Sequence, residues 1–322
     1  MRGDQTVGAA PDIPLLVLIG PTATGKTRLS VALAEHLLTR GWQMEAVSAD
    51  SRQIYQGMDI ATAKPTALER ARLTHHMLDV VKPDESYTLA EYQADADAAI
   101  KAIWSRGRLP LLVGGTGLYV RAVVDGLAIP AVAPDPALRS ELEAVARDQG
   151  TAALHARLAH VDPVAARRID SHNPRRLIRA LEVCLLSGRP ISEQQGTRPT
   201  PYQPLILGLT MELQALYLQA DTRIDLMLQQ GLVEETRQLV AAGYAWELPS
   251  MSSLGYREIR AYLRAEMPLP DAVASLKLAT HHYIRRQLTW FRASSRTHWL
   301  DASEPLDTLV TMATDLIIPW LS

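Results

Sequence analysis

The segment GPTATGKT, residues 20–27, constrains the fold of this chain more than any other feature. It matches G-x-x-x-x-G-K-[ST], a loop whose backbone N–H groups surround a chain of phosphates. The apolar run PLLVLI at 14–19 predicts a buried strand before it, and Leu29, Leu33 and Leu37 predict a helix after it. Strand, glycine loop and helix follow in the required order. We therefore predict an α/β fold with a P-loop NTPase-like parallel sheet.

The residues of this loop have separate expected roles. Lys26 would reach the outer phosphates, and the Thr27 hydroxyl would ligate Mg²⁺. The loop N–H groups would act together with the positive end of the helix dipole. The alternative is a glycine-rich turn that binds nothing, which the flanking strand and helix disfavour. The predicted phosphate-binding residues are Gly20, Pro21, Thr22, Ala23, Thr24, Gly25, Lys26 and Thr27.

The bulk composition is that of an ordinary water-soluble protein. The chain has 322 residues, 47% of them hydrophobic, and a net charge of −2. No apolar run approaches the roughly 20 residues of a membrane span, and residues 1–12 lack the apolar core of a signal peptide and predict a loose tail. The single cysteine, Cys184, excludes an internal disulfide and is expected to be buried. We expect a cytoplasmic monomer without membrane contact.

The order of predicted elements divides the chain into three parts. Apolar strands alternate with helices, which predicts a parallel sheet with helices on both faces and ligands at the carboxyl ends of its strands. Near Ile129 a proline-rich stretch begins a purely helical region that ends at a second proline-rich stretch. The strands after the first are expected at 43–49, 75–81, 109–115 and 205–211. We predict a catalytic core at 1–127, a helical insertion at 128–201, and completion of the core at 202–322.

Positive charge is concentrated in two regions. Six arginines lie between Arg157 and Arg179, against two aspartates. Residues 272–300 contain five lysines and arginines, no acidic residue, and four interleaved aromatic side chains. Such a mixture can bind phosphates and stack on bases. The alternative, equally weighted, is an amphipathic helix with a solvated basic face.

Asp50 follows the second predicted strand directly, at the edge where ligands are expected. A carboxylate there can ligate Mg²⁺, anchor a sugar or act as a general base. The alternative is a turn or cap residue, which is common at strand ends. Ser51, Gln53 and Tyr55 add polar and stacking groups that a turn does not need, so we favour a functional role.

Two further candidates lie later in the chain. The segment GGTGLY, 114–119, ends an apolar strand in glycines and Thr116, where ordinary P-loop hydrolases carry an acidic residue. The Thr116 hydroxyl could donate to a phosphate, or it could cap the next helix. Arg223, early in a helix, could clamp a diphosphate, although most helix arginines are solvated.

Taken together, these segments resemble the tRNA dimethylallyltransferase family over most of the chain. The resemblance implies transfer of a dimethylallyl group from dimethylallyl diphosphate to N6 of the adenosine on the 3′ side of the anticodon. It implies tRNAs that read codons beginning with U, and a P-loop core with a helical insertion that grips the anticodon loop. The motifs, in order, are GPTATGKT, DSRQIYQGMDIATAKP, HHMLD, GGTGLY, NPRRLIRALEV, RIDLMLQQGLVEE, GYRE and RRQLTWFR.

The resemblance also implies roles for residues. Lys26, Arg223 and Mg²⁺ would stabilise the leaving diphosphate, Asp50 would accept the N6 proton, and Thr116 would lie on the diphosphate side. The implied tRNA contacts are Asp50, Ser51, Arg52, Gln53, Arg175, Arg176, Leu177, Ile178, Arg179, Arg285 and Arg286.

The chain departs from the family pattern at a few positions. Ala61 stands where glycine is usual, Thr24 where serine is frequent, and His281 and His282 where basic or amide side chains are common. Two other functions are compatible with a P-loop. One is a small-molecule kinase with an arginine-bearing lid, and the other is an RNA-binding regulator with an ATP switch.

Overall fold

The computed structural model describes residues 13–322, so the predicted N-terminal tail lies outside the described residues. The chain divides into two compact units. One comprises the residues up to Val124 together with 201–322, and the other is Asp125–Thr200. The boundaries predicted for the insertion, 128 and 201, lie close to those of the second unit, Asp125 and Thr200. No helix of the described part is long and apolar enough to cross a membrane.

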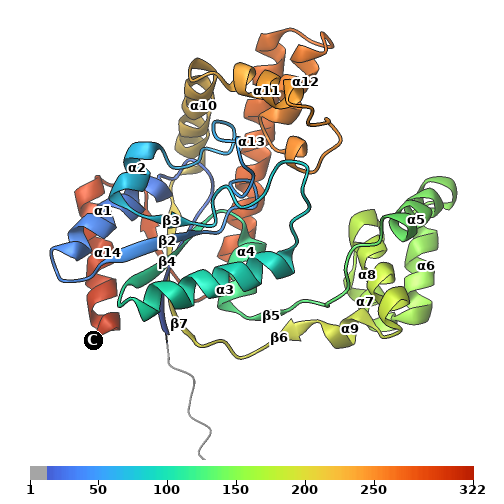
Figure 1. Cartoon of the computed structure of the whole chain (residues 1–322), viewed down its shortest axis with the longest axis horizontal. Helices are drawn as coiled ribbons and strands as arrows, with labels where there is room; N and C mark the ends of the chain where they lie inside the picture. Colours follow the sequence, from blue (N-terminus) through green and yellow to red (C-terminus); the bar gives the residue numbers. More distant parts are fainter. Residues whose placement is uncertain (1–12) are drawn as a thin grey trace, which may run out of the picture. The chain divides into compact units, whose positions relative to one another are not determined.

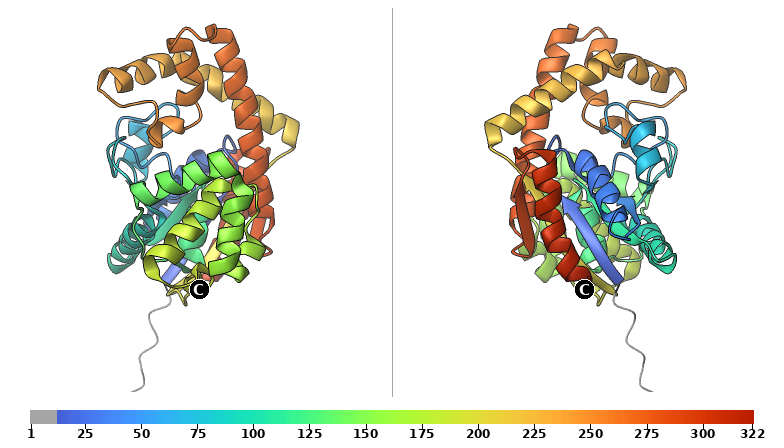
Figure 2. Two further views of the ribbon diagram at one scale, coloured as in Figure 1. Left: turned by 90° about the vertical axis from the view of Figure 1, so that its right-hand side faces the viewer. Right: turned by 90° about the vertical axis from the view of Figure 1, so that its left-hand side faces the viewer.

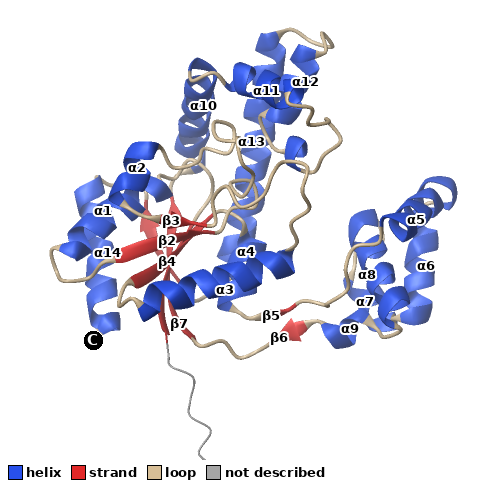
Figure 3. Cartoon of the chain, viewed as in Figure 1, coloured by secondary structure: helices blue, strands red, loops and turns tan. Residues whose placement is uncertain are grey.

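The larger unit is built on a six-stranded sheet in which neighbouring strands pair in parallel (Figures 1 and 3). The strand order is β3-β2-β4-β1-β7-β8. Because parallel strands end at the same edge, the segments after β1, β2 and β4 meet there. The strands are β1 (Ile13–Ile19), β2 (Met44–Ser48), β3 (His75–His76), β4 (Leu109–Gly114), β7 (Tyr202–Thr210) and β8 (Thr297–Asp301).

Helices cover both faces of this sheet (Figure 2). Leu16 and Leu18 of β1 pack in a core with α1 and α14, whereas Leu15 and Val17 pack in a second core with α3 and α4. Each such buried side chain stabilises the fold by about 1.5–3 kcal/mol, so an uninterrupted apolar run specifies a central strand. The helices of this unit are α1 (Lys26–Leu38), α2 (Ala67–Arg72), α3 (Leu89–Ser105), α4 (Gly117–Val124), α10 (Leu213–Gln229), α11 (Leu232–Ala241), the 3₁₀ helix η1 (Ser250–Ser252), α12 (Tyr256–Leu263), α13 (Leu269–Arg292) and α14 (Leu306–Leu321).

Two strands differ from the sequence prediction. The strand predicted at 75–81 ends at His76, because the chain turns at Met77 and Asp79, whose φ angles are +62° and +55°. The basic and aromatic region 272–300 is not one helix, since α13 ends at Arg292 and β8 follows as an edge strand beside β7. A Cβ on Gly208 of β7 would lie 2.6 Å from the Trp299 ring. This glycine therefore makes room for the aromatic side chain of the unpredicted strand.

The helices α10 to α13 share a core with the loop at 49–66, which follows β2. Ile54 and Met58 of this loop are fully buried against side chains that include Tyr256 and Ile259 of α12. The apolar side chains of the loop 49–66 are therefore buried by residues about 200 positions later in the chain.

The second unit is a helical bundle with its own core. Three of its helices begin at a proline that follows a side-chain cap, which is Asp135, Asp162 or Asn173. Cys184 is buried in this core, as predicted. The elements are β5 (Leu127–Ala128), α5 (Pro136–Gln149), α6 (Thr151–Val161), α7 (Pro163–Arg168), α8 (Pro174–Ser187), α9 (Ile191–Gln194) and β6 (Gly196–Thr197), in which β5 and β6 pair antiparallel.

Candidate functional site

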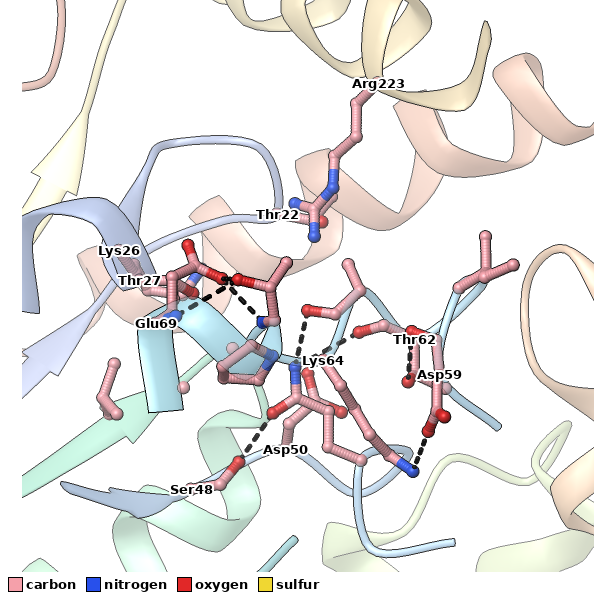
Figure 4. A pocket seen from close by; sticks show the side chains of 18 of the residues that line it. Thr22, Lys26, Thr27, Ser48, Asp50, Asp59, Thr62, Lys64, Glu69 and Arg223 are labelled. Atoms are coloured by element: carbon pink, nitrogen blue, oxygen red, sulfur yellow. Dashed lines mark hydrogen bonds and ion pairs between the residues drawn. The ribbon is translucent and has the colours of Figure 1, made fainter. Parts of the chain in front are cut away.

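A cavity of about 790 Å³ lies at the edge where β1, β2 and β4 end. Its size is within the usual range for small-molecule sites. One wall is the P-loop, residues 20–27, which we call the P-loop wall. The opposite wall is the loop 49–66, and further lining comes from α2, from β3 and the turn after it, from the end of β4, from α10 and from α13. Figure 4 shows the side chains that point into it.

The P-loop wall folds as its motif predicts. Lys26 donates from Nζ to the carbonyl oxygens of Gly20 and Pro21, at 2.9 and 2.8 Å. The Thr24 hydroxyl donates to the Pro21 oxygen at 2.9 Å, so Thr24 closes the loop as serine would. Ala23 has a φ of +67°, a conformation that costs a non-glycine residue energy and that is frequent at functional sites. The predicted residues that line the cavity are Thr22, Ala23, Gly25, Lys26 and Thr27.

Two cationic side chains face this cavity without a carboxylate partner. Arg223 reaches from α10 toward Thr22 (Figure 4), and no ion pair joins it or Lys26 to an acidic residue within residues 13–322. Burial and the charge of Arg223 lower the pKa of Lys26 to about 7, while Asp50 opposes the shift. Burial also lowers the pKa of Arg223. The charge of Asp50 acts on both side chains but pairs with neither, so this side of the cavity holds two desolvated cations that an anion could neutralise.

Asp50 is both a turn residue and a cavity residue. Its Oδ1 accepts a hydrogen bond from the Arg52 amide at 2.8 Å, while the side chain lines the cavity. Gln53 lies beside it, where it accepts from the Ser48 hydroxyl at 2.9 Å and donates to the carbonyl oxygens of Thr62 and Ala63 at 3.2 Å. The two interpretations of Asp50 from the sequence are therefore compatible, because one carboxylate oxygen is enough to hold the turn.

The turn after β4 places glycines, and not Thr116, against the cavity. Gly114 and Gly115 line it, and a Cβ on Gly114 would lie 2.2 Å from the Ala49 oxygen. The Thr116 hydroxyl oxygen instead accepts from the Ser51 amide at 3.1 Å. Its side chain does not cap α4, where the Thr116 carbonyl accepts the first helical hydrogen bonds. Thr116 thus braces the residue next to Asp50.

The loop 49–66 is held by residues that the sequence did not single out. Glu235 of α11 accepts from the amides of Asp59 and Ile60 at 2.9 and 2.8 Å, and from Ala61 at 3.3 Å. Its carboxylate also accepts from the Tyr256 hydroxyl at 2.7 Å. These residues lie in the motifs DIATAKP, RIDLMLQQGLVEE and GYRE, but nothing in the sequence indicates that they pair.

Lys64 adds a second fastening inside the same loop. Its buried Nζ donates to the Tyr55 oxygen at 2.6 Å and to Asp59 and Asp79 at 2.7 and 2.5 Å. Hydrogen bonds from Lys64 counteract the effect of burial and lower the pKa of the Asp79 carboxyl. The loop is therefore anchored to α11 at one point and to the turn after β3 at another.

Ala61, which stands where glycine is usual, packs against a glycine on the other side. Gly255 has a φ of +98°, and a Cβ on it would lie 2.9 Å from the Ala61 Cβ. The methyl group of Ala61 thus occupies the space that the missing side chain of Gly255 leaves.

The candidate RNA contacts differ in accessibility. Arg175 and Arg176 are exposed on α8, whereas Arg179 forms an ion pair with the buried Glu182 at 2.5 Å. Leu177 and Ile178 pack in the core of the second unit, so their side chains present no surface to a nucleic acid. In the larger unit, exposed contacts remain at Arg285 and Arg286 of α13, while Arg52 donates to the Pro249 oxygen at 2.7 Å.

The two histidines of α13 have unequal surroundings. His281 Nε2 is hydrogen-bonded to Asp221 of α10 at 2.9 Å, and the ring stacks on Tyr217. His282 is exposed and contacts Arg285. The departure at His281 is therefore explained by packing between α10 and α13.

Known proteins share both the sequence and the fold. The sequence model of the IPP transferase family matches residues 53–294. A tRNA dimethylallyltransferase of Roseiflexus sp. (strain RS-1) is 49% identical over 96% of this chain and 99% of its own length. That of Roseiflexus castenholzii is 52% identical over 91% of this chain and 94% of its own.

Solved structures agree with these relatives. The crystal structure of the full-length tRNA isopentenylpyrophosphate transferase from Bacillus halodurans superposes with a TM-score of 0.70 at 40% identity, covering 94% of this chain and 95% of that one. A eukaryotic dimethylallyltransferase acting on tRNA has a TM-score of 0.73 at 24% identity over 90% of this chain and 74% of that one, and shares the fold.

Proposed function

Because the chain belongs to the IPP transferase family, whose members include the tRNA dimethylallyltransferases, we propose that its cavity binds dimethylallyl diphosphate on the P-loop wall and receives an adenine beside Asp50. The enzyme is a tRNA dimethylallyltransferase, and the small-molecule kinase and the ATP-switched regulator are set aside. The acceptor atom is N6 of the adenosine on the 3′ side of the anticodon, in tRNAs that read codons beginning with U. We place its activity in the cytoplasm, as a monomer.

The observation that carries the donor site is a pair of cations that form no ion pair within residues 13–322. Lys26 and Arg223 both face the cavity from different elements, and a diphosphate would form the charge-assisted hydrogen bonds that neither makes with a carboxylate. The described residues contain no cluster of three His, Cys, Asp or Glu side chains that could hold a metal by themselves. Mg²⁺ suits such a site, because it is commonly held by one or two protein oxygens, substrate phosphates and water. The Thr27 hydroxyl would supply the protein ligand, and the ion would neutralise charge on the leaving diphosphate.

The reaction uses the two walls for opposite charges. As the bond between the allylic C1 and the diphosphate oxygen breaks, positive charge grows on carbon and the electron pair leaves with the diphosphate. Lys26, Arg223 and the loop amides stabilise that group. On the other side the N6 lone pair, which is delocalised into the adenine ring, attacks C1, and Asp50 accepts the proton that N6 loses. Thr116 holds Ser51, and through it the position of Asp50.

The acceptor must leave its base stack to reach this cavity, so the protein has to bind the RNA around it. We assign phosphate contacts to the exposed Arg285 and Arg286 in the larger unit and to Arg175 and Arg176 in the insertion. Ser51, Arg52 and Gln53 stand next to Asp50 and would face the nucleotide itself.

The direct test is transfer of label. Purified enzyme is incubated with Mg²⁺, dimethylallyl diphosphate labelled in the allyl group, and unmodified tRNA. We expect label in the tRNA at the adenosine next to the anticodon, and none in a tRNA with guanosine at that position. Absence of label from every tRNA, or ADP formed from ATP and a metabolite instead, would refute the assignment.

The RNA-binding role of the insertion has its own test. Replacing Arg175 and Arg176 by glutamine should lower the salt dependence of tRNA binding, by roughly 0.7–0.9 in log–log slope for each phosphate that the protein no longer neutralises. Arg179→Gln is the control, because that side chain already neutralises the buried Glu182. It should lower stability and leave the slope nearly unchanged. A slope that responds only to Arg179 would contradict the assignment.

A further inference from the structure

Helix α13 carries a buried amide that joins two loops of the cavity. Gln287 is 6% exposed. Its Oε1 accepts from the Thr22 amide at 2.9 Å, and its Nε2 donates to the Gly115 oxygen at 2.9 Å. Thr22 belongs to the P-loop wall after β1, and Gly115 to the turn after β4. One side chain therefore spans the ends of two adjacent strands.

The fit around this amide is tight and complete. A Cβ on Gly115 would lie 2.5 Å from Nε2 of Gln287, so the glycine allows the amide to reach the backbone. Burial of an amide is unfavourable unless it is hydrogen-bonded, and here both ends are bonded to main-chain groups. The Thr22 N–H is consequently directed at the protein, which fixes its orientation in a loop whose other amides are expected to face phosphate.

The same helix is fastened to the element that carries Arg223. Lys277 of α13 forms an ion pair with Asp225 of α10 at 2.8 Å, and His281 is hydrogen-bonded to Asp221 at 2.9 Å. These two aspartates flank Arg223 in sequence. Tyr283, one turn before Gln287, lines the cavity. The P-loop wall, the turn after β4 and the helix of Arg223 are thus all attached to α13.

We propose that Gln287 is a positioning residue for the prenyl diphosphate, setting the separation between the P-loop wall and the turn at 114–117. The proposal rests on the proposed donor site. Gln287 lines the cavity, but its Oε1 and Nε2 are bonded to the backbone of Thr22 and Gly115, and it acts on the diphosphate through them. Its loss should weaken diphosphate binding selectively and leave tRNA affinity intact, because the exposed Arg285 and Arg286 stay on the same helix.

The variant Gln287→Met keeps the size of the side chain and removes both hydrogen bonds. We expect the KM for dimethylallyl diphosphate and the Kd for inorganic diphosphate to rise about tenfold, with the Kd for tRNA within about twofold of wild type. Gln238→Met, on the surface of α11, is the matched control and should change neither. A merely structural glutamine would lower the folded fraction and the Tm without moving the ratio of the two affinities.

The variant Gln287→Glu adds a signature in pH. Its carboxylate keeps the acceptor for Thr22 but opposes the Gly115 oxygen, whereas the protonated acid can donate to that oxygen as the amide does. Its diphosphate affinity relative to wild type should therefore recover as the pH is lowered from 8 toward 6. Unchanged donor KM in folded Gln287→Met, or no recovery in Gln287→Glu, overturns the proposal.

The wild-type enzyme gives a measurement that does not depend on folding of a variant. The Thr22 amide should be protected from hydrogen exchange before any ligand is added, and added inorganic diphosphate should increase that protection. Free exchange of this amide would overturn the proposal. Failure of the proposed function is seen separately, as wild-type enzyme that transfers no label.

Discussion

The two walls of the cavity are shaped by contacts of different range. In the P-loop wall, Lys26 bonds to carbonyls five and six positions away, and Thr24 to one three positions away. The loop 49–66 is held by Glu235, which is 174–176 positions away from the amides that it accepts from. The P-loop wall, to which we assign the donor, therefore obtains most of its shape locally. The wall that carries the proposed base depends on contacts with the C-terminal helices.

The largest effect should come from the remotely held wall, through Asp50. Asp50→Asn keeps the hydrogen bond to the Arg52 amide but cannot accept a proton. We expect kcat to fall by about 10²–10⁴-fold, the usual contribution of a general base, with the diphosphate Kd and the Tm nearly unchanged. The control is Asp84→Asn, because the carboxylate of Asp84 is exposed in the segment between β3 and α3. Near-normal turnover of Asp50→Asn would move the base elsewhere, and lost donor affinity would indicate a metal ligand.

A smaller effect should follow from weakening the hydrogen bonds that hold the loop 49–66 while Asp50 is left in place. Glu235→Gln weakens the acceptor shared by three loop amides, and we expect a decrease of about 1–3 kcal/mol in unfolding free energy. Hydrogen exchange at residues 59–61 should accelerate before exchange in the P-loop wall. Glu234→Gln, its neighbour on the outer face of α11, removes an ion pair with the exposed Arg237 and leaves an oxygen for the exposed Gln238, so it should be nearly neutral. Equal exchange in both walls would mean that they unfold together and would erase the distinction.

The smallest effect sharpens the description of the P-loop wall. With a pKa of about 7, Lys26 is charged at pH 6 and largely neutral at pH 8, so binding of a diphosphate at pH 8 should draw a proton onto it. Calorimetry in buffers of different ionisation enthalpy measures the protons taken up on binding. At pH 8 the wild-type enzyme should take up as much as about one proton more than Lys26→Arg, because arginine stays charged at pH 6 and at pH 8. At pH 6 the two proteins should agree. Equal uptake at pH 8 would mean that Lys26 is already charged in the free enzyme.

The same difference in range explains what the sequence could predict. The apolar run before Gly20 and the motif after it were enough to place β1, the loop and α1, because each is specified by neighbours in the chain. The position of Asp50 in the cavity also followed from its place at the carboxyl end of a predicted parallel strand. The roles of Glu235, Lys64 and Gln287 could not be predicted. The sequence around a polar side chain does not indicate which distant group it will bond. For the same reason β8 was missed, since its five residues become a strand only beside Gly208.

The strand order also has a consequence for synthesis of the protein. The strand β1 is central, yet its partner β7 begins at residue 202, after the whole insertion. At usual rates of translation, of about 5–20 residues per second, β1 waits on the order of ten seconds or more beside the ribosome with one edge unpaired. The insertion has its own core and can fold during that interval. A substitution that lowers the stability of the insertion, for example at Glu182, should therefore increase aggregation of the nascent chain. It should lower the yield of folded enzyme although it leaves the cavity lining unchanged.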